Sequence, residues 1–160
     1  MQATATLREG SIRLDETVRS LLRQKDSTLW SISADATVYD AIQTMSDKHV
    51  GCLLVLSGGR LSGIITERDY ARKVVLQGRA SHQTHVRDIM TKPVLFVRQE
   101  ETLDHAMRLM TTRRVRHLPV CDGEQVIGIV SMGDLVRWLV DTQDRTIRHL
   151  HDYIQGTYPR

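Results

Sequence analysis

Two short segments, GIITERD at residues 63–69 and GIVSMGD at residues 128–134, share one pattern that decides the fold. Each runs from a glycine through two residues of high β-propensity to a hydroxyl residue, and an aspartate follows three positions later. A hydroxyl residue followed at this spacing by an acidic one fits the capping box that begins a helix. Each segment therefore predicts a strand that leads directly into a helix.

The similarity extends beyond these segments, because residues 37–69 align without a gap with residues 102–134. Ten of the 33 aligned pairs are identical, where average residue usage would give about two between unrelated sequences. The identical positions include apolar residues, turn glycines and the final aspartate of each motif. The chain therefore contains an internal structural repeat.

Each copy of the repeat predicts the order helix, strand, strand, helix. Apolar residues at helical spacing follow Thr37 in the first copy and Thr102 in the second, and threonine is a good N-cap. A glycine-containing turn then joins two short apolar runs. The expected strands are residues 52–56, 61–65, 117–121 and 126–130, and a short extended segment precedes each copy. The expected fold class is α/β (α+β), with two pseudo-symmetric repeats that each hold a small sheet flanked by helices.

The repeat divides the chain into five expected parts. They are an N-terminal extension with a short helix (1–29), the first repeat (30–79), a linker (80–93), the second repeat (94–141), and a C-terminal helix with a tail (142–160). Apolar spacing predicts the leading helix within residues 12–25. The polar stretch at 77–93 predicts a loop, and the polar stretch at 141–146 predicts an interruption in a long helix that begins near Leu135.

Composition describes one compact domain. The 160 residues are 41% hydrophobic and 26% charged, and the formal net charge is +3. No apolar run approaches the roughly 20 residues that cross a membrane, and the N-terminal residues lack the apolar stretch of a secretory signal. We therefore expect a cytoplasmic protein with no membrane partner. Cys52 and Cys121 lie far apart, each within or at the end of an apolar run, which indicates reduced, buried thiols.

The repeated hydroxyl and aspartate have a structural and a functional interpretation. As capping boxes, they need only to begin helices. Gly63 and Gly128 favour a further role, because glycine weakens a strand unless backbone or a ligand approaches closely. A helix N-terminus attracts phosphate, and a carboxylate accepts hydrogen bonds from a ribose diol. The duplicated motif is therefore typical of nucleotide binding, with capping alone as the structural alternative.

At these residues the sequence resembles the cystathionine-β-synthase-type (CBS) domain family, whose strands end in glycine, two apolar residues, Ser or Thr, two variable residues, and Asp or Asn. DIMT at 88–91 and RHLPV at 116–120 add to the resemblance, which covers residues 30–141 as a tandem pair. The resemblance implies a compact CBS pair with two clefts for adenosine-containing ligands such as AMP, ADP, ATP, S-adenosylmethionine or NAD. It also implies a regulatory or sensor module in signal transduction.

The resemblance implies a role for each motif residue. Asp69 and Asp134 would bind ribose hydroxyls, and Thr66 and Ser131 would lie beside ribose or phosphate. The other residues implied at the clefts are Val50, Gly51, Cys52, Arg68, Lys92, Pro93, Val115, Arg116, His117, Met132 and Gly133.

The resemblance also places the adenine across the repeats. It would lie near residues 50–52 in the Asp134 cleft and near residues 115–117 in the other. Arg116 and His117 would contact phosphate, whereas the first copy has uncharged residues at the equivalent positions. We therefore expect the two clefts to bind ligand unequally.

Other function classes have weaker support. The pI near 9.1 and the basic run at 113–117 favour a nucleic-acid-binding regulator, but no recognition motif accompanies them. The chain has no nucleophile elbow, phosphate loop or zinc-protease motif, so we expect a non-enzyme without catalytic residues or a catalytic cofactor. Turnover of a bound nucleotide is the enzymatic alternative. The histidines lack companions at metal-ligand spacing, so we expect no metal site.

Two kinds of protein partner are expected. The resemblance implies a homodimer that forms through helices, and an effector protein of unknown identity that receives the signal. The terminal helix supports the dimer with apolar residues at Leu135, Leu139, Leu150 and Ile154. Nucleic acid is a disfavoured partner.

Overall fold

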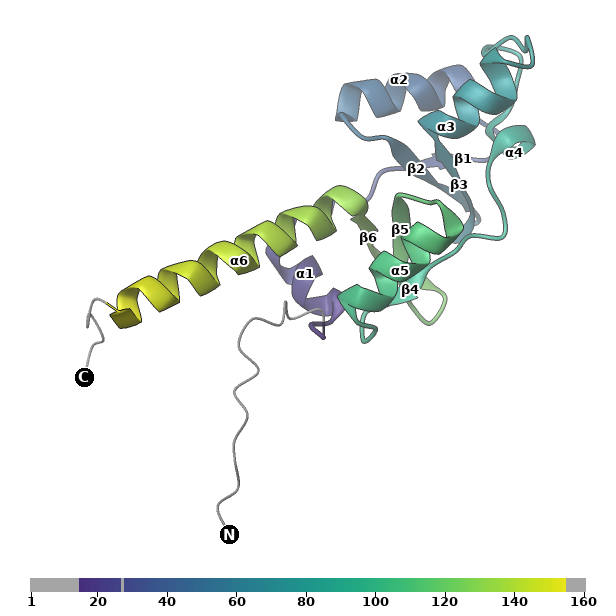
Figure 1. Cartoon of the computed structure of the whole chain (residues 1–160). Helices are drawn as coiled ribbons and strands as arrows, with labels where there is room; N and C mark the ends of the chain where they lie inside the picture. The colour runs from purple at the N-terminus through teal and green to yellow at the C-terminus, as the bar shows by residue number, and fades with distance from the viewer. Residues whose placement is uncertain (1–14, 27, 155–160) are drawn as a thin grey trace.

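The structure is a computed structural model that describes residues 15–26 and 28–154. Its helices are α1 (Val18–Gln24), α2 (Val38–Lys48), α3 (Glu67–Tyr70), the π-helix η1 (Ala71–Val75), α4 (Val86–Ile89), α5 (Leu103–Arg113) and α6 (Met132–Ile154). Its strands are β1 (Ser31–Ser33), β2 (Cys52–Ser57), β3 (Arg60–Thr66), β4 (Val97–Arg98), β5 (His117–Asp122) and β6 (Gln125–Ser131). These mixed helices and small sheets confirm the expected fold class (Figure 1).

Two three-stranded sheets of the same design have the strand orders β1-β2-β3 and β4-β5-β6. In each sheet the first strand runs parallel to the second, and the third runs antiparallel to it. The hairpin register is also the same, with Cys52 opposite Thr66 and His117 opposite Ser131. The start of each central strand therefore lies beside the hydroxyl residue of its own motif.

The helices that precede these hairpins begin and end in the same way in both repeats. Thr37 caps α2 and Thr102 caps α5, and each hydroxyl accepts a hydrogen bond of 3.1 Å from a backbone N–H three residues further on. Both helices end at a left-handed residue with φ of 54°, His49 in the first repeat and Arg114 in the second. Local chemistry therefore sets the same helix length twice.

Helices α1 and α4 exchange places between the repeats. Val18 and Leu21 of α1, upstream of the first sheet, are buried in the core built by β4, β5, β6, α5 and α6. Val86 and Ile89 of α4, upstream of the second sheet, are buried in the core of the first repeat. Figure 1 shows α1 beside α6 and α5, and α4 on the side of α3. Each core therefore needs a helix from outside its own repeat, which ties the two repeats together.

The strand glycines make room for these exchanged segments. A Cβ on Gly63 would lie 2.6 Å from Sδ of Met90, which follows α4, and a Cβ on Gly128 would lie 2.7 Å from Cδ2 of Leu22 in α1. Both distances are shorter than van der Waals contact allows. The close approach that the sequence predicts at these glycines is therefore made by side chains of the chain itself.

The observed helices differ from the expected ones at three places. Helix α1 begins at Val18, whereas residues 12–14 of the expected helix lie outside the described residues. The expected loop at 77–93 contains α4, because the apolar residues of α4 complete the first core. The expected interruption at 141–146 is absent, and α6 runs unbroken from Met132 to Ile154.

The first turns of helix α6 pack into the core of the second repeat. Leu135 and Trp138 are buried in that core, and Leu139 packs against it. Leu135 therefore does not provide the exposed dimer surface expected of it, and the side chains of Leu150 and Ile154 lie outside the described residues. Although α6 is 23 residues long, no helix within 15–26 and 28–154 is long and apolar enough to cross a membrane.

Candidate functional site

Two adjoining cavities, each of about 390 Å³, lie against the two repeated motifs. We name them the Asp69 cleft and the Asp134 cleft after the motif aspartate in the wall of each. Gly51, His117 and Ser131 line both of them. A ligand in one cleft would therefore come close to the other.

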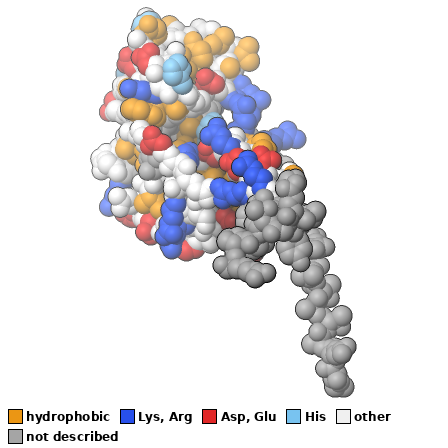
Figure 2. All heavy atoms as spheres, turned by 90° about the vertical axis from the view of Figure 1, so that its left-hand side faces the viewer, with side chains coloured by type: hydrophobic (Ala, Val, Ile, Leu, Met, Phe, Trp, Pro, Cys, Tyr) orange, Lys and Arg blue, Asp and Glu red, His pale blue; other side chains and the backbone are white. Residues whose placement is uncertain are grey.

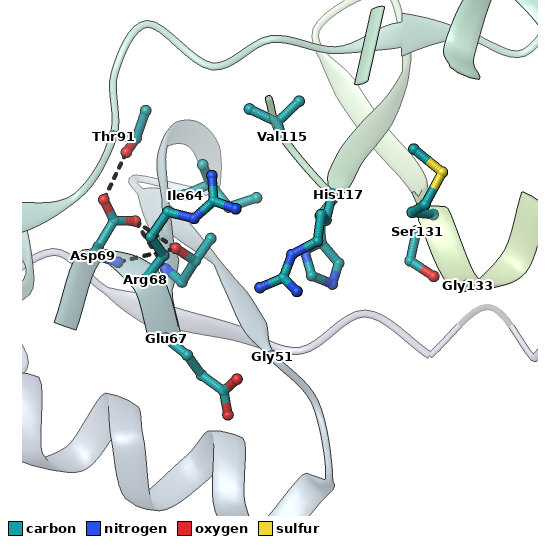
Figure 3. Close-up of a pocket in the computed structure, with 13 residues that line it drawn as sticks. Gly51, Ile64, Glu67, Arg68, Asp69, Thr91, Val115, His117, Ser131 and Gly133 are labelled. Atoms are coloured by element: carbon teal, nitrogen blue, oxygen red, sulfur yellow. Dashed lines mark hydrogen bonds between the residues drawn. The ribbon is translucent and has the colours of Figure 1, made fainter. Parts of the chain in front are cut away.

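Residues from both repeats line each cleft. The Asp69 cleft is lined by Gly51, Ile64, Thr66, Glu67, Arg68, Asp69, Thr91, Val115, Arg116, His117, Ser131, Met132 and Gly133. The Asp134 cleft is lined by Lys25, Asp26, Thr28, Leu29, Trp30, His49, Val50, Gly51, Cys52, Leu54, His117, Ile129, Ser131 and Asp134. Figure 3 shows the Asp69 cleft with Asp69 and Thr91 on one side and Ser131 on the other, and His117 between them.

Both motif aspartates act as helix caps. The Thr66 hydroxyl accepts the backbone N–H of Asp69 at 3.2 Å, and the Ser131 hydroxyl accepts that of Asp134 at 3.1 Å. In return, Oδ2 of each aspartate accepts the backbone N–H of its hydroxyl residue, at 3.0 Å for Thr66 and 2.8 Å for Ser131. The capping interpretation therefore holds in both repeats, and the two carboxylates differ in the other hydrogen bonds that they accept.

In the first repeat the chain itself fills the carboxylate. Oδ1 of Asp69 accepts the Thr91 hydroxyl at 3.0 Å and pairs with Nζ of Lys73 at 2.7 Å, and Oδ2 also accepts the Thr66 hydroxyl at 3.0 Å. A carboxylate has about four acceptor positions, and with the Thr66 backbone N–H all of them are taken. The residue is 7% exposed. Asp69 is therefore buried, and its carboxylate has no acceptor position left for a ligand.

In the second repeat the carboxylate keeps one oxygen open. Oδ2 of Asp134 accepts Nζ of Lys25 at 2.7 Å, and the same ammonium donates to the carbonyl of Ile129 at 2.9 Å. No hydrogen bond from the described residues ends on Oδ1. Burial opposes ionisation of Asp134, but hydrogen bonds from Lys25 and Ser131 outweigh it and lower the pKa of this carboxyl. Asp134 is therefore a charged acceptor with a free oxygen at a cavity.

Cationic side chains gather in the Asp69 cleft. Arg68 donates to the carbonyl of Arg114 at 2.7 Å, which joins the first repeat to the second. The carbonyl of Arg116 accepts the Met132 backbone N–H at 2.9 Å, and its guanidinium group has no hydrogen bond or ion pair with the described residues of this cleft. Burial lowers the pKa of His117, and the nearby Arg116 lowers it further, so the imidazole between the clefts is kept neutral near pH 7.

One part of the wall of the Asp134 cleft is apolar. Leu29, Trp30, Val50 and Leu54 line it beside Cys52, and burial raises the pKa of the Cys52 thiol to about 12. This thiol is thus an uncharged, inert part of the wall. Such a surface fits the flat face of a base, whereas the arginines of the neighbouring cleft fit an anion.

The structure brings together most of the residues that the resemblance implies at the clefts. Residues 50–52 lie in the Asp134 cleft and residues 115–117 in the Asp69 cleft, each opposite the motif of the other repeat. Lys92 and Pro93 are exposed and line neither cleft. The preceding Thr91 takes the expected position instead.

The lysines that pair with the motif aspartates were missed from the sequence. Lys73 lies one helical turn after Asp69, which is a readable i,i+4 signal. Lys25 is 109 positions from Asp134 and has no local signal. An indirect signal was available, because VRSLL at 18–22 resembles VRDIM at 86–90 and marks the two exchanged segments.

The basic run at 113–117 is divided by the fold. Arg113 and Arg114 end α5 at the surface, whereas Arg116 and His117 line the clefts. On the face shown in Figure 2, basic side chains lie among acidic ones and form no continuous basic surface. Among the described residues no group of three His, Cys, Asp or Glu side chains could hold a metal ion.

The family comparison agrees with this architecture. The family model described as "CBS domain" matches residues 15–76 and 86–141. The chain is 41% identical over 153 residues to the "CBS domain-containing protein CBSX3, mitochondrial" of Arabidopsis thaliana. The matching region covers 92% of this chain and 74% of the relative. The chain therefore belongs to the CBS domain family, as a tandem pair.

Solved structures show the same fold. A CBS-domain protein from Burkholderia ambifaria MC40-6, a proposed signal-transduction protein, is 46% identical and superposes with a TM-score of 0.77 over 79% of this chain and 95% of its own. The CBS domain pair of protein MJ0100 is 25% identical, with a TM-score of 0.68 over 76% of this chain and 94% of its own. The MJ0100 structure contains 5′-methylthioadenosine and S-adenosyl-L-methionine.

Proposed function

We propose that this CBS pair is a regulatory module that binds an adenosine-containing nucleotide between its repeats and passes the bound state to an effector protein. The observation that carries the proposal is Asp134, which lines a cavity walled in part by the other repeat. Its pKa is lowered, and its Oδ1 accepts no hydrogen bond from the described residues. A charged carboxylate in this position accepts hydrogen bonds from a ribose diol. The candidate ligands are AMP, ADP, ATP and NAD.

Two relatives support this proposal. The complex of the MJ0100 pair holds two adenosine compounds, and the Burkholderia ambifaria protein has been proposed to act in signal transduction. In the present chain the clefts offer a ribose acceptor, an apolar wall and nearby cations. These groups suit binding without chemistry, since the neutral His117 and the inert Cys52 provide no activated nucleophile.

The exchange of helices gives such a ligand a means of regulation. A ligand that contacts both repeats favours the arrangement in which both sets of contacts exist, and it shifts a partner equilibrium by its difference in affinity for the two states. Lys25 follows α1, whose residues complete the second core, and it also lines the Asp134 cleft. Occupancy of the cleft would therefore be transmitted to α1 and the adjacent α6.

The proposal includes a homodimer. Val136, Val140 and Ile147 are 51%, 51% and 63% exposed on α6, and their spacing places them on one face of the helix. A mass of one chain by light scattering at all working concentrations would contradict the dimer. A cytoplasmic location also stays a prediction, since the Arabidopsis relative is described as mitochondrial, and cell fractionation tests it.

Thermal unfolding with a ligand panel tests the function. AMP, ADP, ATP, NAD and S-adenosylmethionine are compared at millimolar concentration, with GMP as the control for the base. At about 100 times Kd, a ligand that binds only the folded chain adds about 2.7 kcal/mol, which is a rise in Tm of roughly 5 to 10 °C at this size. If no adenosine compound raises Tm, the proposed function is wrong.

A further inference from the structure

The two clefts adjoin each other and share part of their walls. Gly51, His117 and Ser131 each line both, and His117 is the neutral side chain between them. Gly51 has no side chain to separate the cavities, and a Cβ there would lie 3.7 Å from Cε1 of His117. A single ligand can therefore extend from one cleft into the other.

The motif carboxylates of the two clefts are not equivalent. Both aspartates are caps, but Oδ1 of Asp69 is filled by Thr91 and Lys73, whereas Oδ1 of Asp134 has no donor among the described residues. A ribose diol at Asp69 would have to displace an ammonium group and a hydroxyl from a buried carboxylate. At Asp134 it would find an open acceptor.

The two clefts also differ in their positively charged side chains, and here it is the Asp69 cleft that offers more to a ligand. Arg68 and Arg116 lie in the Asp69 cleft. Lys73 neutralises the charge of Asp69, and Glu67 offsets the charge of one arginine, so one positive charge remains. The counterparts of the two arginines in the repeat are Gly133 and Gly51, which bring no charge to the other cleft. The Asp69 cleft therefore favours an anion.

Among the described residues that line the Asp134 cleft, Lys25 is the single lysine or arginine. Lys25 pairs with Asp134, and the nearby carboxylate of Asp26 adds negative charge. Phosphate groups therefore meet no unpaired lysine or arginine among the described lining residues, whereas the apolar side chains of Trp30 and Val50 fit a base.

We propose that the two clefts together bind one nucleoside phosphate per chain, with the nucleoside in the Asp134 cleft and its phosphates in the Asp69 cleft. This inference rests on the proposed function and specifies its stoichiometry and direction. The ribose is held at Oδ1 of Asp134, and the phosphates pass His117 to reach Arg116 and Arg68. Asp69 does not contact ribose, and instead holds the wall of the phosphate end through Thr91 and Lys73.

Titration calorimetry of the wild-type full chain with adenosine, AMP, ADP and ATP tests the inference without depending on any variant. We expect one molecule bound per chain for each compound. Affinity should rise along the series, with ATP at least about tenfold tighter than adenosine, because charge-assisted hydrogen bonds to the arginines are added. Two molecules bound per chain, or ATP no tighter than adenosine, would overturn the inference.

Three substitutions with a matched control locate the two ends. Asp134→Asn should weaken adenosine and ATP by a similar factor of about tenfold or more, and Asp69→Asn should leave adenosine affinity within about threefold. Arg116→Gln should weaken ATP about tenfold and leave adenosine unchanged. Arg113→Gln, which removes the same charge from an exposed position outside both clefts, should change neither.

The outcomes separate this inference from the function on which it rests. If none of the compounds binds, the proposed function fails. If they bind but Asp69→Asn weakens adenosine as much as Asp134→Asn does, the function stands and the shared site is wrong. The same holds if Arg116→Gln and Arg113→Gln weaken ATP equally, because the effect would then come from net charge alone.

Discussion

Replacing Lys25 with methionine tests the ion pair that connects the segment after α1 to the second motif. The side chains of Lys25 and Asp134 are 25% and 15% exposed, so the pair is partly screened by water but largely buried. Methionine keeps most of the packing of the lysine stem and removes the ammonium group. Hydrogen bonds to charged groups contribute about 1.5–3 kcal/mol each, and we expect a loss of this size in the free energy of unfolding at pH 7.

Lys73→Met is the matched control in the first repeat. Lys73 pairs with Asp69 at the same distance of 2.7 Å, but its side chain is 43% exposed, and Asp69 keeps hydrogen bonds from Thr66 and Thr91. Exposed ion pairs contribute about 0–1 kcal/mol, so this variant should lose less than Lys25→Met. Urea unfolding of both variants measures the difference.

The pH dependence gives a second check on the same pair. The pKa of Asp134 is lowered in the folded chain, so its contribution to stability is present above the unfolded value of about 3.8 and is lost as pH falls through the folded value. The stability gap between wild type and Lys25→Met should therefore narrow in acid. Equal stability of the two proteins at pH 7, or a gap that persists when Asp134 is protonated, would refute the reasoning.

Three further predictions concern burial. Leu21→Ala should lower the free energy of unfolding by about 2–5 kcal/mol, because Leu21 is 5% exposed in the second core. Leu76, which is 75% exposed, is the control and should tolerate alanine within about 0.5 kcal/mol. Urea unfolding measures both losses, and a small loss for Leu21→Ala would contradict the exchange of helices. Burial lowers the pKa of His117, so the unfolded chain binds its proton more readily and stability should fall as pH drops below 6.5; a His117→Gln variant should lose part of this slope, and identical slopes would count against it. Cys52, with a pKa of about 12, should resist iodoacetamide at pH 8 until urea unfolds the chain, and rapid labelling of the native protein, detected by mass spectrometry, would contradict its burial.

The hairpins and their capped helices could be predicted from the sequence because their causes are local. Threonine caps, turn glycines and β-branched runs act within a few residues, and the same pattern 65 positions later has the same result. The strands predicted at 52–56 and 117–121 lie within β2 and β5. The short helix α4 was missed because its four residues are stabilised by the core they enter and not by their own propensity.

The sequence by itself determined the repeat and the two capped motifs. Only the tertiary structure decided that α1 belongs to the second core, that Thr91 donates to Asp69, and that Lys25 leaves one oxygen of Asp134 open. The physical reason is the range of the interactions. Helix caps and apolar periodicity depend on residues within a few positions of one another. The hydrogen-bond donors that reach a carboxylate depend on where distant segments pack. Two motifs of the same pattern therefore acquire different chemistry.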